Sequence, residues 1–216
     1  MNINLGNDVN TGKKVNVSVS SPLLVHGQHE SRNFAISKIV TCRFFRALQT
    51  VDNIYFLSPK SSSANYSSFD ALKQSSTRII RSRPLKKDYS KIVRKTFRNR
   101  SNKDTDVFVV TSVESLKKGV LRELYQKTVY DKNTYLTLVS KTPPIQPSGR
   151  NVIITSPYGK LLRKYQVKLN ISTSQIKEFK RLYKRTKHST KHYLVTTNNF
   201  TTLGKVQLSS LERAFL

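Results

Sequence analysis

The chain has 216 residues, a hydrophobic content of 37%, 10 Phe and 10 Tyr, which is enough apolar material for a folded core and excludes wholesale disorder. A formal net charge of +27 predicts a polyanionic partner, either nucleic acid or an anionic membrane surface. Because no stretch approaches the ~18 apolar residues of a membrane span, we expect nucleic acid as the partner and no membrane span.

The single cysteine, Cys42, cannot form an internal disulfide. The first 14 residues lack the basic start and apolar middle of a secretory signal. We therefore expect an intracellular protein in a reducing compartment, the nucleus or the cytoplasm.

Residues 1–14 are polar and show no periodicity, so we expect a tail. Residues 15–200 predict a single α/β domain, and residues 201–216 a C-terminal extension. Within the domain, alternating valines at 15–19 predict a strand with one solvated face, and the apolar run 23–25 predicts a second strand.

A βαβ unit is predicted next: the run 23–25, a loop that opens at Gly27, an amphipathic helix over 33–48 and a strand over 54–57. Such a unit receives its ligand beyond the carboxyl end of its first strand. The usual phosphate cradle there is GxxxxGK[ST], in which backbone amides and the lysine hold phosphate. Here only the first glycine is kept, and the degenerate nucleotide-binding candidates are Gly27, Ser31, Arg32 and Asn33.

Three departures from that pattern predict lost chemistry. Arg32 stands at the second glycine, Asn33 at the lysine and Phe34 at the hydroxyl that ligates magnesium. We therefore expect no cofactor; ATP and Mg would bind only if the degenerate loop still works. His26, His29 and Glu30 lie in the same loop without a third ligand at metal spacing, so we expect no metal site.

A basic insertion is predicted over about residues 60–104. Between residues 73 and 103 there are twelve Lys or Arg and one acid, Asp88. A solvated charge run is the alternative to a nucleic-acid-binding segment. The candidate nucleic-acid-binding residues of this segment are Lys73, Arg78, Arg81, Arg83, Lys86, Lys87, Lys91, Arg94, Lys95, Arg98 and Arg100.

The third strong strand is predicted over residues 106–113. A nucleotide hydrolase would place a magnesium-holding acid at its end, but Thr111 and Ser112 stand there. Glu114 is a weak catalytic candidate as a displaced acid; the alternative is an acid in the first turn of a helix over 114–130. Further strands are predicted over 135–139 and 152–155.

The last elements are a helix from about Ser172 to His188 and a strand over 192–197. One face of this helix is basic, which fits either a solvated surface or contact with nucleic acid. Its candidate binding residues are Lys177, Lys180, Arg181, Lys184, Arg185 and Lys187. Alternating strands and helices predict a mostly parallel sheet with helices on both faces.

Several segments together resemble the DNA-packaging ATPases of large DNA viruses, in the FtsK and HerA superfamily. PLLVHG and NIYFLSP resemble that family's first two strands, and VFVVTSVES stands where its acidic strand belongs. NTYLTLVSKTPPIQPSGRNVIIT and FKRLYKRTKHSTKHYLVTT are similar to its later strands and closing helix.

The resemblance implies a P-loop (RecA-like) α/β fold. It implies Gly27 as the first P-loop glycine, Ser140 as the polar sensor at a strand tip and Arg150 as an arginine that reaches a neighbouring subunit's nucleotide. It further implies DNA rather than RNA, a homo-oligomer, viral capsid or packaging proteins as partners and a place in a virion.

We therefore expect a catalytically inactive, packaging-associated viral protein that binds nucleic acid on a degenerate packaging-ATPase scaffold. One alternative is a nucleocapsid-like or ribosome-associated RNA- or DNA-binding protein that binds no nucleotide. A second is an active ATP-driven packaging motor subunit. Nucleotide binding at Gly27 and the formation of rings would separate them.

Overall fold

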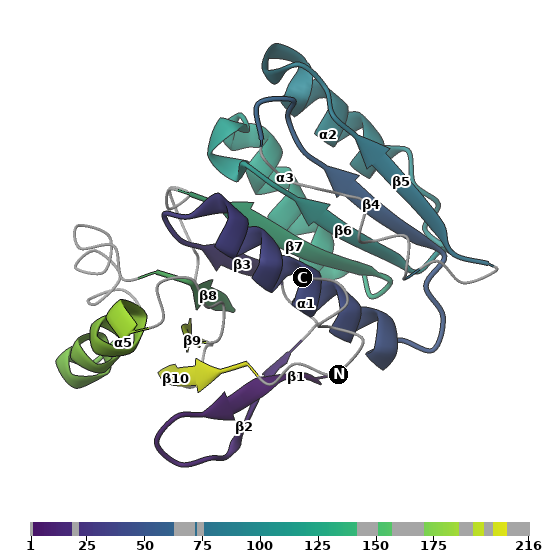
Figure 1. The fold of residues 1–216 in the computed structure, drawn as a ribbon. Coiled ribbons are helices and arrows are strands. Elements are labelled where there is room, and N and C mark those ends of the chain that lie inside the picture. The colour runs from purple at the N-terminus through teal and green to yellow at the C-terminus, as the bar shows by residue number, and fades with distance from the viewer. Residues whose placement is uncertain are drawn as a thin grey trace.

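The computed structural model describes residues 2–18, 22–62, 72, 76–141, 151–156, 171–185, 192–196 and 201–206. Their strands form one sheet in the order β2-β1-β10-β9-β8-β3-β7-β6-β4-β5 (Figure 1). The strands are β1 (Asn2–Asp8), β2 (Lys14–Ser18), β3 (Leu23–His26), β4 (Asn53–Leu57), β5 (Arg78–Ser82), β6 (Asp106–Val110), β7 (Thr134–Ser140), β8 (Val152–Ile154), β9 (His192–Thr196) and β10 (Thr201–Lys205). The helices are α1 (Glu30–Ala47), α2 (Tyr89–Arg98), α3 (Lys118–Tyr130) and α5 (Thr173–Arg185), with 3-10 turns η2 (Lys86–Asp88) and η3 (Val113–Ser115).

The half of the sheet from β8 to β5 is parallel, and β9, β10, β1 and β2 continue it with antiparallel pairings. Strands β3, β4 and β6 are buried along their whole length. Continuous apolar runs of this kind are typical of parallel strands covered on both faces. The predicted mostly parallel α/β sheet is confirmed.

Two apolar layers cover the sheet. On one face α1 packs through Ile36, Val40 and Phe44 against alternate strand residues such as Val109. On the other face α2, α3 and α5 share a second core, which includes Phe97, Leu124 and Phe179 against Phe108 and Leu194. Helices with one apolar stripe form here because each has a sheet face to bury it against. No helix in the described ranges is both long and apolar enough to cross a membrane.

The ends of the chain differ from the sequence prediction. Residues 1–14 are not a tail, because β1 pairs with both β2 and β10 and buries Ile3 and Leu5. Gly6 has φ +135 in a bulge, and a Cβ there would lie 2.2 Å from the Lys205 carbonyl oxygen. Residues 201–205 are a sheet strand and not part of an extension, whereas residues 207–216 lie outside the described residues.

The basic segment also differs from the prediction. Among the described residues of 60–104, β5 adds a parallel strand beside β4, and α2 buries Tyr89, Val93 and Phe97 on the sheet. The Tyr89 hydroxyl donates to the carbonyl oxygens of Leu57, at 3.0 Å, and Thr111. Through this apolar stripe, the described part of the segment packs on the sheet as part of the fold.

Residue Leu5 tests the role of β1. Substitution Leu5→Ala should lower the free energy of unfolding by about 2–5 kcal/mol, because a buried leucine leaves a cavity in a packed core. Exposed Asn2 on the same strand is the matched control, and Asn2→Ala should change stability by less than about 0.5 kcal/mol. Urea unfolding measures both variants. Equal, small effects would mean that β1 is dispensable.

Candidate functional site

The candidate nucleotide mouth lies where β3 ends at His26 and α1 begins at Glu30. Gly27 sits in a tight space between these elements: a Cβ there would lie 2.0 Å from Thr155 Oγ1 and 2.8 Å from Asn33 Oδ1. The Gly27 N–H donates to the Ser140 carbonyl oxygen at 3.2 Å, and the Gln28 N–H donates to Ser156 Oγ at 2.8 Å. These two amide groups are therefore hydrogen-bonded within the chain and are not available to bind a phosphate.

Asn33, which stands at the lysine position, is fully buried. Its Nδ2 donates to the carbonyl oxygens of Gly27 at 2.6 Å and Ser140 at 3.0 Å. Its Oδ1 accepts from the Thr155 hydroxyl. The side chain that replaces the catalytic lysine thus joins α1 to the ends of β3 and β7 and to the residue after β8, and supplies no charge to a ligand.

Arg32, at the second glycine position, is a packing residue. Its guanidinium lies 4.9 Å from the ring centroid of Tyr183 on α5, and the ring of His29 stacks on the same tyrosine at 6.3 Å. Burial lowers the pKa of Arg32, while the Tyr183 contact acts in the opposite direction. Two residues of the degenerate loop therefore hold α5 against the start of α1. Ser31, the remaining loop candidate, is exposed.

Glu114 and Ser140, which were predicted as candidates from separate segments of the sequence, are in contact. The Ser140 hydroxyl donates to Glu114 Oε2 at 2.9 Å, and the Lys141 N–H donates to the same oxygen at 3.3 Å. The Lys141 ammonium in turn pairs with Glu30 Oε2 at 2.6 Å. Sequence reasoning missed Lys141, because nothing local in the sequence connects it to Glu30. Arg150, the third weak catalytic candidate, lies outside the described residues.

The mouth does not fit magnesium and ATP. Asn33 gives no cation, and buried Phe34 gives no hydroxyl to a magnesium ion. At the end of β6 the Thr111 hydroxyl donates to Ser58 Oγ at 2.7 Å, and Ser112 has a left-handed φ of 51°. No group of three His, Cys, Asp or Glu side chains suited to a metal ion lies in the described part of the chain.

The second candidate site is the set of basic residues around α2. Lys91 and Lys95 are exposed on α2 one turn, or about 6 Å, apart, and exposed Lys87 lies in the turn η2 just before the helix, so the three form one row. None of the three pairs with a carboxylate of the described residues. The other exposed candidates of this segment are Arg78, Arg81, Arg83, Lys86 and Arg98.

Some of the predicted nucleic-acid-binding residues form ion pairs within the fold. The Glu123 carboxylate on α3 accepts two hydrogen bonds from the Arg98 guanidinium, at 2.5 and 3.0 Å, and forms an ion pair with Arg94 at 3.2 Å. The Arg100 side chain is only 5% exposed and pairs with Asp131 and, at 4.0 Å, with Asp106. Arg100 is therefore a buried structural cation, and its assignment to a nucleic-acid surface is wrong. Lys73 lies outside the described residues.

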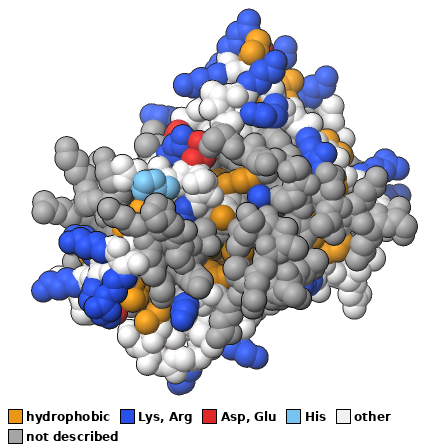
Figure 2. Space-filling model, in the orientation of Figure 1, with side chains coloured by type: hydrophobic (Ala, Val, Ile, Leu, Met, Phe, Trp, Pro, Cys, Tyr) orange, Lys and Arg blue, Asp and Glu red, His pale blue; other side chains and the backbone are white. Residues whose placement is uncertain are grey.

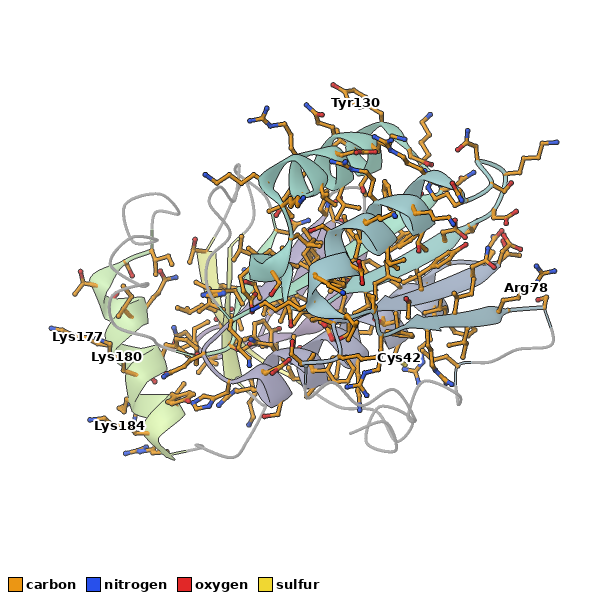
Figure 3. The ribbon with its side chains drawn as sticks, turned by 90° about the horizontal axis from the view of Figure 1, so that it is seen from above. Cys42, Arg78, Tyr130, Lys177, Lys180 and Lys184 are labelled. Atoms are coloured by element: carbon orange, nitrogen blue, oxygen red, sulfur yellow. The ribbon has the colours of Figure 1, made fainter. Side chains whose placement is uncertain are left out.

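On α5 the predicted basic face is exposed. Figure 3 shows Lys177, Lys180 and Lys184 pointing outward from the helix, away from the sheet. Arg185 is also exposed, and Arg181 is held by Glu178 at 2.5 and 3.0 Å. The predicted helix reaches Arg185 in the described residues; Lys187 lies beyond them.

Both basic rows belong to helices on the same face of the sheet, because α2 and α5 share one apolar core with α3. Helix α3 adds exposed cations that the sequence prediction did not include: Lys118, Arg122 and Lys127. Figure 2 shows Lys and Arg gathered over the α2 region at the top and over α5 at the lower left. The described charge on this face is concentrated on helices.

No protein-family model and no curated protein sequence matches the chain. Solved structures do. VirB4 of Thermoanaerobacter pseudethanolicus is 10% identical with a TM-score of 0.65, over 98% of each chain. The genome packaging NTPase B204 of Sulfolobus turreted icosahedral virus 2, solved with ATP-gammaS, is 13% identical with a TM-score of 0.56, over 88% of this chain and 100% of that one.

The pCW3 conjugation coupling protein TcpA, solved with ATPgS, is 9% identical with a TM-score of 0.52, over 95% of this chain and 65% of that one. The chain therefore shares the P-loop ATPase fold of these structures. The P-loop α/β fold predicted from the order of the segments is confirmed.

Two buried groups give opposite pH dependences. Burial raises the pKa of Asp106 to about 6, against opposing effects of the Asn53 hydrogen bond and the Arg100 charge. Burial also lowers the pKa of His26 to about 4, opposed by its hydrogen bond to the Ser140 carbonyl. Asp106 thus stabilises the fold at low pH and loses this effect as the pH rises through about 6. His26 stabilises the fold above its unfolded pKa, and this effect is lost as the pH falls.

We expect the two effects to offset each other between about pH 4 and 6, where both groups bind different numbers of protons in the folded and unfolded states. In Asp106→Asn, stability should rise with pH over this window, because only the His26 effect remains. In His26→Gln, stability should fall with pH. Urea unfolding at half-unit pH steps measures both slopes. Two variants with slopes of the same sign would contradict this assignment.

Proposed function

We propose that this chain binds nucleic acid, DNA in preference to RNA, through exposed cations of α2 and α5 on an FtsK/HerA-type scaffold without ATP hydrolysis. The observation that carries the proposal is the pair of cation rows, Lys87, Lys91 and Lys95 near α2 and Lys177, Lys180 and Lys184 on α5. Each row is exposed, lacks a carboxylate partner among the described residues and belongs to the same face of the sheet.

Polyanion binding follows from these rows by a simple mechanism. Each ammonium that neutralises a phosphate releases a condensed counterion, which favours binding and makes it depend on salt. Except for Lys87, which lies in the turn η2 before α2, both rows lie on helices anchored by buried aromatic residues, Phe97 on α2 and Phe179 on α5. The cations are therefore presented from rigid elements, and binding does not require a segment to fold first.

The loss of hydrolysis follows from the composition of the mouth. Phosphoryl transfer depends on positioned positive charge that stabilises the transferring phosphate. Neutral Asn33 replaces the lysine, and Arg32 is buried against Tyr183. Glu114 remains near the mouth, but without the lysine and a magnesium-binding hydroxyl it has no reaction to assist.

The proposed biological setting is genome packaging or the virus particle. A genome packaging NTPase has the same fold, and a chain that keeps this fold and a basic face is suited to a DNA-contacting subunit without motor chemistry. Assembly with itself or with capsid or packaging proteins is part of the same proposal.

The α2 row gives the first test. The variant Lys87→Gln, Lys91→Gln, Lys95→Gln should bind a DNA duplex about 10- to 100-fold more weakly at 0.1 M salt. The slope of log affinity against log salt should fall by about 2.7 if each lysine neutralises one phosphate. Fluorescence anisotropy over a salt series measures both quantities.

Its matched control changes three exposed lysines elsewhere, Lys13, Lys14 and Lys60, to Gln. The control should keep most of the affinity and slope. Equal losses in both variants would mean that net charge alone attracts the duplex, and that α2 is no binding surface. A tighter complex with an RNA of the same sequence would favour the nucleocapsid-like or ribosome-associated alternative.

Nucleotide binding gives the second test. Calorimetric titration of ATP with magnesium should show no binding, and phosphate release should stay at background with and without duplex DNA. DNA binding in the same preparation shows that the protein is folded. DNA-stimulated hydrolysis would instead establish an active packaging motor subunit.

A further inference from the structure

The mouth beyond β3 contains an ion pair that the proposed function does not use. Glu30 in the first turn of α1 pairs through Oε2 with the Lys141 ammonium at 2.6 Å. Its Oε1 accepts a hydrogen bond from the Ser62 hydroxyl at 2.5 Å. The Glu30 side chain is only 13% exposed. Three separate segments thus converge on one carboxylate: the start of α1, the residues after β4 and the residue after β7.

We infer that the Glu30 carboxylate is the built-in anion of this mouth and excludes phosphate from it. The inference rests on the proposed loss of nucleotide chemistry and gives it a physical cause. A carboxylate held by an ammonium, a hydroxyl and a helix N-terminus has the same kinds of partner that proteins offer to a phosphate oxygen. Here the chain supplies the anion itself.

The surroundings favour a closed mouth. Glu30, Asn33, Ser62, Thr111, Ser140 and Lys141 line one hollow. Glu114 reaches the same place, because its Oε2 accepts from the Ser140 hydroxyl and the Lys141 N–H. Two carboxylates therefore lie beside Lys141, Glu30 at its ammonium and Glu114 at its backbone N–H, and they would repel a phosphate that entered.

Glu30 and Glu114 make a matched pair for a test. Glu30→Gln and Glu114→Gln each remove one negative charge from the same hollow. Only Glu30→Gln removes the partner of the Lys141 ammonium, because the contact of Glu114 with Lys141 is to the backbone N–H. The inference requires that the first variant gain a phosphate site and the second not.

The probe is inorganic pyrophosphate, titrated by calorimetry into the full chain. We expect no binding to the unchanged protein or to Glu114→Gln. Glu30→Gln should bind at least tenfold more tightly than either, and adding Lys141→Gln to it should abolish the gain. Equal binding by Glu30→Gln and Glu114→Gln, or binding to the unchanged protein, would overturn the inference.

A second variant, Glu30→Ala, is needed because a glutamine at this position can keep the hydrogen bonds of Glu30 and so still close the mouth. For a marginally stable variant, the shift of Tm with pyrophosphate is the measurement, because a ligand that binds only the folded state raises Tm. No shift in either Glu30 variant would also overturn the inference. Duplex binding is measured separately. If the unchanged protein binds no duplex DNA, the proposed function is refuted, and the pyrophosphate result still tests the inference by itself.

Discussion

The carbonyl oxygen of Ser140, at the end of β7, is the point on which the centre of the molecule depends. It accepts from Asn33 Nδ2 at 3.0 Å, from the Gly27 N–H at 3.2 Å and from His26 Nδ1 at 3.1 Å. Because these donors are buried, a donor left without its acceptor would cost about 1–3 kcal/mol. Since a carbonyl can only accept, His26 carries a proton on Nδ1, and burial, which lowers its pKa to about 4, keeps the ring neutral at neutral pH. The end of β3, the tip of β7 and the start of α1 are thereby fixed without any ligand.

A chain with a formal net charge of +27 must limit its own repulsion. The few acids are placed where they neutralise cations within the fold: Glu123 beside α2, Asp131 at Arg100, Glu30 at Lys141 and Glu178 on α5. Many of the remaining exposed lysines lie on the outer faces of helices, and others, such as Lys13, Lys14 and Lys60, lie on strands and loops. The same distribution that makes folding possible leaves the outer layer of helices strongly positive.

The order of the central elements was predictable, because β3, β4, β6, β7 and β8 are mostly apolar runs and α1 follows a loop at Gly27, whereas β5, which reads RIIRS, and α2 in the basic segment were not predicted. The end strands were not: β1 alternates Asn2, Ile3, Asn4 and Leu5 over too few apolar residues to stand out, and β10 reads TTLGK. Their pairing partners lie almost the whole chain apart. At the mouth, the sequence predicted which residues departed from the phosphate pattern. It did not predict Lys141, whose partner is distant in sequence, or the packing of Arg32 on Tyr183.

The position of β10 has a consequence for synthesis. This strand lies between β9 and β1 in the sheet, so the hairpin of β1 and β2 joins the rest of the sheet through β10, which is synthesised much later than the hairpin. Pairing between segments so far apart carries a large cost in loop closure before contacts repay it. On the ribosome, the parallel strands from β3 to β7 emerge well before that final pairing is possible. The antiparallel side of the sheet therefore closes last, and until then β1 presents an open edge that a neighbouring nascent chain can pair with.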